Sequence, residues 1–387
     1  MAIIKKCVTI INNRSGHRHK ARAYTDTLKQ YMDRAGIVHH DIHVPNDDVG
    51  ENFCRALPHA EALVICGGDG TVNRAVNLMA CMATTATKPT SSGEHCESSA
   101  LLSSSLPQIQ SVLDATPLLL VPTGLHNSIA TSLGIGAAER AVSSLVVGRA
   151  VHIPLWAVRL HSPSAPPTSP APVRYMCSYI AAGTYAAIVQ RQETFKAAQG
   201  DYVSLPPLLG TLAAASLYTT VQHSTPHCTA ELKTSTGSSS DLALHSLGPL
   251  RMLVAAQMPQ LQAGYSLTPT ATYHQHRLAV TTAADDVTRM RMWHLLRREA
   301  REGYILSEDG VAMHEEVREL RVEFPRPSGE GTGSQKSDCN LDVGDSKTAA
   351  DDEETALLVL DGECVRIPHG SSVTVTPTEL TAQLIVS

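Results

Sequence analysis

Residues 64–73, with the sequence VICGGDGTVN, place three glycines around one aspartate directly after an apolar stretch. Glycine lets the backbone adopt positive φ and approach an anion closely, and the N–H groups that open a following helix attract phosphate. A carboxylate beside bound phosphates would repel them unless it holds a metal ion or takes a proton from an attacking hydroxyl. The stretch therefore predicts a phosphate-binding turn between a strand and a helix, with Asp69 used in one of these two ways.

The surrounding pattern predicts a parallel α/β domain. Short apolar runs favour strands, and they occur at residues 8–11, 62–66 and 117–121, while residues 38–44 read as a further strand. Helical spacing of apolar residues falls between them, at residues 18–36, 50–57 and 71–82. This alternation is typical of a Rossmann-like parallel sheet. We place the domain at residues 1–148, with an inserted loop at residues 83–108, which are rich in Ser and Thr and carry no period.

The remainder of the chain, residues 149–387, reads as a β-rich, sandwich-type domain. Its apolar runs are short and strand-like, and one helix is expected at residues 287–302. Polar, proline-rich or acidic stretches interrupt the pattern, and they predict insertions at residues 161–172, 222–246 and 326–354.

Composition excludes some classes of function. The net charge of -6 and the pI near 6.3 argue against a nucleic-acid partner. No apolar run approaches the roughly 18 residues that a membrane-spanning helix needs, so we expect a cytoplasmic protein whose contact with membranes is peripheral. The sequence makes no prediction about the oligomeric state.

Two more turns follow predicted strands. Residues 12–16 (NNRSG) open a helix that is rich in basic residues, which would oppose the helix dipole unless an anion binds there; a solvated basic face is the alternative. Residues 121–127 (VPTGLHN) offer backbone N–H groups and small polar side chains, although an ordinary capped turn would look the same. Because ligands bind outside the carboxyl ends of the strands in such sheets, the three turns together predict one site.

These turns resemble the motifs of one enzyme family. Residues 12–16 resemble its NPxSG turn, residues 67–73 its GGDGTxN turn, residues 121–127 its PxGxxN segment, and residues 360–363 (LDGE) its DGE turn. The family is that of the diacylglycerol kinase catalytic domain and the sphingosine kinases, whose fold is related to that of NAD kinases. The resemblance implies ATP and Mg²⁺ bound between an α/β domain and a β-sandwich domain, with a lipid hydroxyl as phosphoryl acceptor.

Carried over by position, the resemblance assigns a set of residues to the nucleotide cleft. They are Asn12, Asn13, Arg14, Ser15, Gly16, Gly67, Gly68, Gly70, Thr71, Asn73, Pro122, Thr123, Gly124, Asn127 and Glu193. Asp69 and Asp361 are both candidates for the general base, and Glu363 is expected to act through Mg²⁺. An Asp-Gly pair between apolar runs is also a strong hairpin signal, so a plain turn remains the alternative for Asp361 and Gly362.

The resemblance also directs the choice of substrate. Residues 180–183 with Glu193 are similar to a sphingosine kinase segment, and residues 202–217 resemble the helix that lines the lipid pocket there, or else form a buried core helix. We therefore expect an ATP-dependent lipid kinase that phosphorylates a sphingoid base or diacylglycerol at a membrane surface.

The chain also departs from the family pattern. Arg74 stands where the family has Glu, and Leu125 and His126 interrupt the third turn. Two alternatives follow: a kinase for a soluble acceptor, as in NAD kinase, and a pseudokinase that binds nucleotide or lipid without turnover.

Overall fold

The structure is a computed structural model. It describes residues 4–16, 18–44, 49–85, 102–124, 127–135, 141, 143–144, 147–163, 171–199, 228–235, 242–326 and 355–386. The expected helix at residues 202–217 and the predicted insertion at residues 326–354, apart from Arg326, lie outside these ranges.

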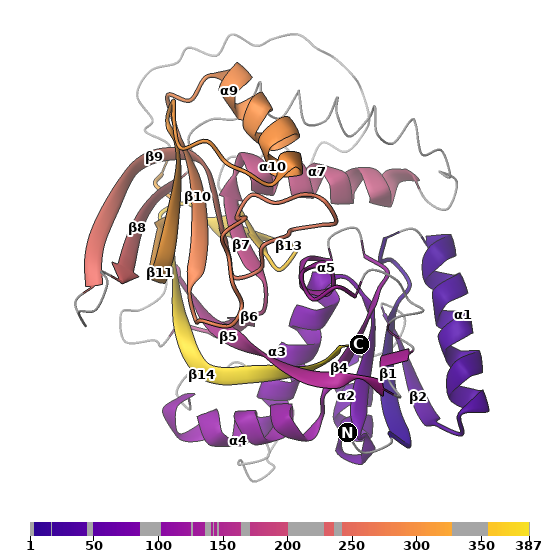
Figure 1. The fold of residues 1–387 in the computed structure, drawn as a ribbon. Helices are drawn as coiled ribbons and strands as arrows, with labels where there is room; N and C mark the ends of the chain where they lie inside the picture. Colours follow the sequence, from indigo (N-terminus) through magenta and orange to yellow (C-terminus); the bar gives the residue numbers. More distant parts are fainter. Residues whose placement is uncertain are drawn as a thin grey trace.

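The first part of the chain is an α/β domain, as predicted (Figure 1). Its parallel strands lie in the order β2-β1-β3-β4. They are β1 (Lys6–Asn12), β2 (Val38–Val44), β3 (Ala62–Gly67) and β4 (Leu118–Pro122). The helices are α1 (Arg18–Arg34), α2 (Val49–Ala56), α3 (Asp69–Thr85), α4 (Leu102–Ala115) and α5 (Ser128–Ser132), with a short 3-10 turn at Leu57–His59. Every residue of β3 is buried, as expected for a central parallel strand covered on both faces.

The second part is built mainly from antiparallel strands, in agreement with the predicted β-rich domain. Along the main path of the sheet they lie in the order β13-β12-β7-β9-β10-β11-β14, while β5, β6 and β8 pair beside it. They are β5 (Arg149–His161), β6 (Val173–Met176), β7 (Tyr179–Gly183), β8 (Cys228–Ser235), β9 (Leu242–Ala256), β10 (Leu278–Ala284), β11 (Val311–Glu323), β12 (Thr355–Leu360), β13 (Glu363–Pro368) and β14 (Ser372–Val386).

Two helical segments lie against these strands (Figure 1). One is α7 (Thr184–Gln199). The other confirms the helix expected at residues 287–302, and it is continuous from α9 (Arg289–His294) through a π-helical turn (Leu295–Glu299) to α10 (Ala300–Glu302).

Strand β14 joins the two parts of the molecule. Its first residues, Ser372–Val375, pair with β11 in the antiparallel sheet, whereas Leu384 and Ile385 pair in parallel with β4. Its last residues are buried in the core of the α/β domain, and Figure 1 shows the strand running from one sheet to the other. Residues from the far end of the chain thus complete the first domain, an arrangement that no local pattern had indicated.

Two of the predicted insertions are shorter than expected. We placed a loop at residues 83–108, but α3 continues to Thr85 and α4 begins at Leu102. Ile109 and Leu113 of α4 are each 1% exposed, so burial of one apolar stripe stabilises this helix. The Ser residues and Pro107 in the same stretch are not typical of a helix, which is why the sequence predicted a loop. The stretch at residues 222–246 contains all of β8, whose Cys228, Ala230 and Leu232 alternate inward among polar residues.

Candidate functional site

The three predicted turns meet at one edge of the parallel sheet. A Cβ atom added to Gly16, whose φ is +54°, would lie 1.8 Å from the carbonyl oxygen of Thr123. A Cβ on Gly124 would lie 2.5 Å from Cα of Gly68. The three turns are therefore packed backbone against backbone, and glycine is required because no side chain fits between them.

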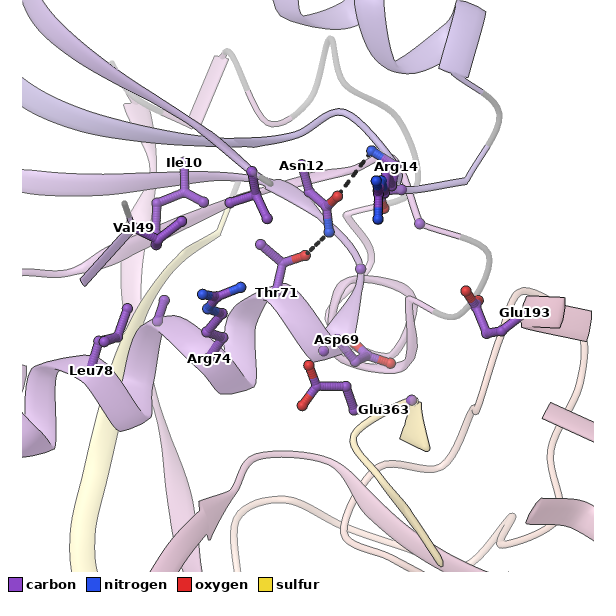
Figure 2. A pocket seen from close by; sticks show the side chains of 17 residues that line it. Ile10, Asn12, Arg14, Val49, Asp69, Thr71, Arg74, Leu78, Glu193 and Glu363 are labelled. Atoms are coloured by element: carbon purple, nitrogen blue, oxygen red, sulfur yellow. Dashed lines mark hydrogen bonds between the residues drawn. The ribbon is translucent and has the colours of Figure 1, made fainter. Parts of the chain in front are cut away.

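Hydrogen bonds fix these turns to one another. The side-chain amide of Asn12 donates to Oγ1 of Thr71 over 3.0 Å, and its oxygen accepts from the backbone N–H of Arg14 (Figure 2). The carbonyl oxygen of Gly67 accepts from the N–H groups of Thr123 and Gly124. The strand ends thus form a rigid frame whose geometry is set before any ligand binds.

A cavity of about 190 Å³ opens beside this frame. One end is apolar, and it is lined by Ile10, Val44, Val49, Ala75 and Leu78. The other end is polar, and it is lined by Asn12, Arg14, Ser15, Gly68, Asp69, Gly70, Thr71, Gly124, Glu193, Gly362 and Glu363. Arg74 lies between the two ends, and its exposed guanidinium extends from α3 into the space (Figure 2).

The second domain closes the polar end. Gly70 lies close to the β12–β13 turn, since a Cβ there would be 3.5 Å from the carbonyl oxygen of Asp361 and 3.6 Å from Cγ of Glu363. Glu363 opens β13 and Glu193 comes from α7, and both carboxylates line the cavity. Burial, with these two negative charges beside it, raises the pKa of the neighbouring Cys364 thiol to about 12. The cavity therefore lies between the two parts of the chain.

Asp69 is a buried carboxylate on the cavity wall. It is 2% exposed, and its two oxygens accept hydrogen bonds from the backbone N–H groups of Ser128 (2.7 Å) and Ile129 (3.1 Å), which open α5. Burial raises the pKa of Asp69 well above its ordinary value, Asp361 raises it further, and the two amides oppose the shift. Asp69 thus accepts the hydrogen bonds of the N–H groups that open α5, and its carboxylate, whose pKa is raised, also lies on the cavity wall.

A pH-dependent stability follows from this raised pKa. A carboxyl group with a higher pKa in the folded than in the unfolded protein stabilises the fold at pH values below its unfolded pKa, and this contribution is lost as the pH rises through the folded pKa. We expect the unfolding free energy of the parent protein, relative to that of Asp69→Asn, to fall as the pH rises from about 4. Urea unfolding of both proteins across this range measures the difference, and a difference that increased with pH would contradict the assignment.

Asp361 is fully buried and does not line the cavity. Its carboxylate accepts five hydrogen bonds of 2.7–2.9 Å, which come from the backbone N–H groups of Cys177, Ser178 and Tyr179, the hydroxyl of Ser178 and the side-chain amide of Asn73. Burial raises the pKa of Asp361, and these donors oppose the rise. Because Asn73 lies on α3 and the other donors lie at the junction of β6 and β7, this carboxylate ties the two domains together.

The Asp-Gly pair forms a hairpin turn that lies beside the cavity. Asp361 and Gly362 have φ values of +48° and +81°, as a two-residue hairpin turn requires, and they join the paired strands β12 and β13. The same turn carries Gly362 and Glu363 to the cavity wall. The hairpin therefore positions Gly362 and Glu363 at the cavity.

Several residues assigned by the resemblance lie behind the cavity. Asn13 hydrogen-bonds with His43, Asn73 donates to Asp361 and to the carbonyl oxygen of Tyr175, and Asn127 donates to the carbonyl oxygen of Gly124. Gly16, Gly67, Pro122 and Thr123 belong to the packed turns and are not among the lining residues. These residues support the groups that line the cavity. Leu125 and His126 lie outside the described residues.

The apolar wall was missed at the sequence level. Thr71, Arg74, Ala75 and Leu78 line the cavity together, and they lie three, four and seven residues apart on α3. That spacing places them on one face of the helix. This spacing was the available signal for that part of the wall.

The fold and the site define a class. Proteins of this class have two domains. The glycine turns at one edge of a parallel sheet in the first domain face a hairpin of the β-rich domain across one cavity. Residues 6–158 match the family model described as the diacylglycerol kinase catalytic domain. This match supports a kinase catalytic domain over residues 6–158.

Solved structures show the same fold over nearly the whole chain. A protein from Bacillus anthracis str. Sterne that is provisionally named as a diacylglycerol kinase has a TM-score of 0.55 and 11% identity, with 100% of this chain and 97% of that chain covered. A diacylglycerol kinase from the same organism has a TM-score of 0.51 and 10% identity, with 100% and 98% covered. No curated protein sequence matches the chain. Among the described residues, no helix has the length and apolar character to cross a membrane.

Proposed function

We propose that this protein is an ATP-dependent lipid kinase, which transfers the γ-phosphate to a hydroxyl of a sphingoid base or diacylglycerol. The observation that carries the proposal is the cavity itself. It joins an apolar end to a polar end built from three glycine turns, and a buried carboxylate of raised pKa lies on its wall. This arrangement supports a nucleotide whose phosphates are held beside a proton acceptor.

The two ends of the cavity match the two ends of a nucleotide. The side chains of Ile10, Val49 and Leu78 would contact the base, because they form the apolar wall. The backbone N–H groups around Gly68, Gly70 and Gly124 would bind the phosphates, since glycine lets an anion approach the main chain closely. Arg14 and Arg74 add positive charge to the same space, and neither guanidinium makes an ion pair with another described residue.

The carboxylates at the polar end fit a magnesium ion shared with the nucleotide. Among the described residues, no group of three or more His, Cys, Asp or Glu side chains could hold a metal alone. Mg²⁺ in kinase sites is usually bound by one or two carboxylates together with substrate phosphates and water. Glu363 is the first candidate ligand and Glu193 the second, because both line the cavity. When bound, the ion would neutralise the charge that develops on the transferring phosphoryl group.

Asp69 is the better candidate for the general base. It lines the cavity and has a raised pKa, as a carboxylate that accepts a proton at neutral pH requires. Asp361 is enclosed by five donors and has no exposed surface, so an acceptor hydroxyl has no route to it. We therefore assign proton transfer to Asp69 and a positioning role to Asp361.

The proposal is tested by an acceptor panel. Purified protein is incubated with Mg²⁺ and radiolabelled ATP, and with sphingosine, diacylglycerol, ceramide or NAD in separate reactions. We expect labelled product with sphingosine or diacylglycerol, and none from Asp69→Asn under the same conditions. Product from NAD alone would establish a soluble-acceptor kinase instead, and ATP binding without any product would establish a pseudokinase.

Arg74 has a measurable expected role in nucleotide binding. The guanidinium lies in the cavity and has no carboxylate partner among the described residues, so bound phosphates would become its counter-charge. Because a hydrogen bond to a charged group contributes about 1.5–3 kcal/mol, Arg74→Ala should weaken ATP binding by about tenfold or more. Calorimetric titration with ATP measures this, and Arg74→Lys should retain part of the affinity.

A further substitution at Arg74 tests whether the guanidinium helps or hinders nucleotide binding. Arg74→Glu restores the residue type that the resembled family has at this position. If that variant bound ATP more tightly or turned over faster than the parent protein, the guanidinium would be an obstacle in the site and its assignment to the phosphates would be wrong.

A further inference from the structure

One helical surface of the β-rich domain carries several exposed arginines. The continuous helix from Arg289 to Glu302 buries one face in an apolar cluster that α7 also joins, through Met292, Leu295, Leu296 and Ala300. A buried ion pair between Arg291 and Glu299, at 2.5 Å, fixes the same face. The helix is therefore held in one orientation, which determines the side chains on its outer face.

The outer face combines arginines with large apolar side chains. We call it the arginine face, and it consists of Met290, Trp293, Arg297, Arg298 and Arg301. Met290 is 66% exposed, the three arginines are exposed, and Trp293 is half-buried. The guanidinium carbon of Arg297 lies 5.4 Å from the centroid of the Trp293 ring, within cation–π distance.

Little negative charge neutralises this face. Among the described residues, Arg298 has one ion-pair partner, Glu302, at 3.0 Å, and neither Arg297 nor Arg301 makes an ion pair. The exposed acidic residues of the neighbouring loops, Asp286, Glu308 and Asp309, lie at the opposite end of the helix, where Gly310 contacts Val287. A helix rises about 1.5 Å per residue, so this end is separated from the arginines by more than a Debye length of about 8–10 Å.

We propose that the arginine face is a docking surface for a bilayer that contains anionic phospholipid; this inference rests on the proposed lipid-kinase function. The chain as a whole carries a net charge of -6, so the face is a local excess of positive charge and not a consequence of composition. Guanidinium groups bind lipid phosphates, while Trp and Met side chains enter the boundary between head groups and acyl chains. The face thus has the chemistry of an interfacial helix.

The position of the face is consistent with delivery of a lipid to the cavity. The buried side of the helix shares an apolar cluster with Tyr185, Ile188 and Val189 of α7, and α7 also carries Glu193 to the cavity wall. Figure 1 shows α9 and α10 farther from the α/β domain than α7 is. A bilayer on the arginine face would therefore lie against a helix whose buried side shares this cluster with α7, the helix that carries Glu193 to the cavity wall.

The two tryptophans of the chain make the contact measurable. Trp156 is fully buried, so a change in tryptophan emission on addition of vesicles reports on Trp293. With phosphatidylcholine vesicles that contain phosphatidylserine, we expect a blue shift and quenching by brominated acyl chains. Vesicles of phosphatidylcholine alone should give neither. No effect with either vesicle would overturn the proposal.

A charge-reversal pair identifies the surface. Because each arginine near an anionic membrane contributes about 1 kcal/mol, Arg297→Glu/Arg301→Glu should weaken vesicle binding at least about tenfold in sedimentation assays. Arg34→Glu/Arg174→Glu changes the net charge equally at exposed positions elsewhere and should bind as the parent protein does. Thermal unfolding of all three proteins confirms that they are folded. Equal losses in the two double variants would attribute binding to net charge and refute the assignment.

These assays require no turnover, so they separate the two proposals. Vesicle binding that depends on the arginine face, without lipid phosphorylation in the acceptor panel, would remove the proposed function and retain the surface. Phosphorylation of lipid in detergent micelles, with vesicle binding unaffected by Arg297→Glu/Arg301→Glu, would retain the function and remove the surface.

Discussion

Replacing Asp69 with Asn is expected to lower kcat for the lipid acceptor by about 10²–10⁴-fold, the range that general-base catalysis contributes. The amide has nearly the same shape as the carboxylate but cannot accept a proton at neutral pH. Asp69 lies on the cavity wall, and burial raises the pKa of its carboxyl group toward the range in which a base acts efficiently. Steady-state kinetics with saturating ATP measures the effect.

The same substitution also disturbs the start of α5, and the experiment must separate the two effects. The Asn oxygen can accept from only one of the two N–H groups of Ser128 and Ile129, and the unmet bond costs about 1–3 kcal/mol of stability. ATP affinity and the unfolding midpoint of the variant are therefore measured beside kcat. A folded Asp69→Asn variant that binds ATP and keeps near-normal turnover would exclude Asp69 as the base.

The second large effect is expected at Asp361, and it concerns stability. Five donors from α3 and from the β6–β7 region converge on this buried carboxylate. An amide in its place directs an NH₂ group at donors that cannot accept from it, so Asp361→Asn should lower the unfolding free energy by about 3 kcal/mol or more. Urea unfolding measures the change.

The comparison of the two Asp→Asn variants is informative because the substitution is identical. Asp361→Asn should lose stability with a smaller loss of kcat per folded molecule, whereas Asp69→Asn should lose kcat with a smaller loss of stability. If Asp361→Asn abolished turnover while leaving the unfolding free energy unchanged, Asp361 would be the catalytic group, as the sequence alone left open.

Local patterns were sufficient to predict the parallel domain. The strands at residues 62–66 and 117–121 are uniformly apolar, and the glycines at positions 16, 68 and 124 mark backbone contacts that no side chain permits. The strong signals reflect strong physical constraints, namely burial on both faces of a strand and a turn without space for Cβ. Such constraints act on neighbouring residues and can be recognised without the tertiary structure.

The features that were missed depend on residues far apart in the chain. Strand β8 alternates Cys228, Ala230 and Leu232 with polar residues, and short buried side chains give a weak hydrophobic signal. The hydrogen bonds that the Asp361 carboxylate accepts come from Asn73 and residues 177–179, which are far from it in the chain. From the sequence alone, its structural role could therefore not be distinguished from a catalytic one. The apolar wall of the cavity combines β1, β2, α2 and α3, which only the fold brings together.

The path of β14 also has a consequence for how the protein is made on the ribosome. The edge of β4 at Leu118 and Leu119 is completed by Leu384 and Ile385, which are synthesised only after the other strands of the β-rich domain. Until then, the growing α/β domain exposes an unpaired strand edge, which is a template for intermolecular pairing. Expression of the first domain alone would leave that edge permanently open, so attempts to isolate it should begin by attaching the β14 segment.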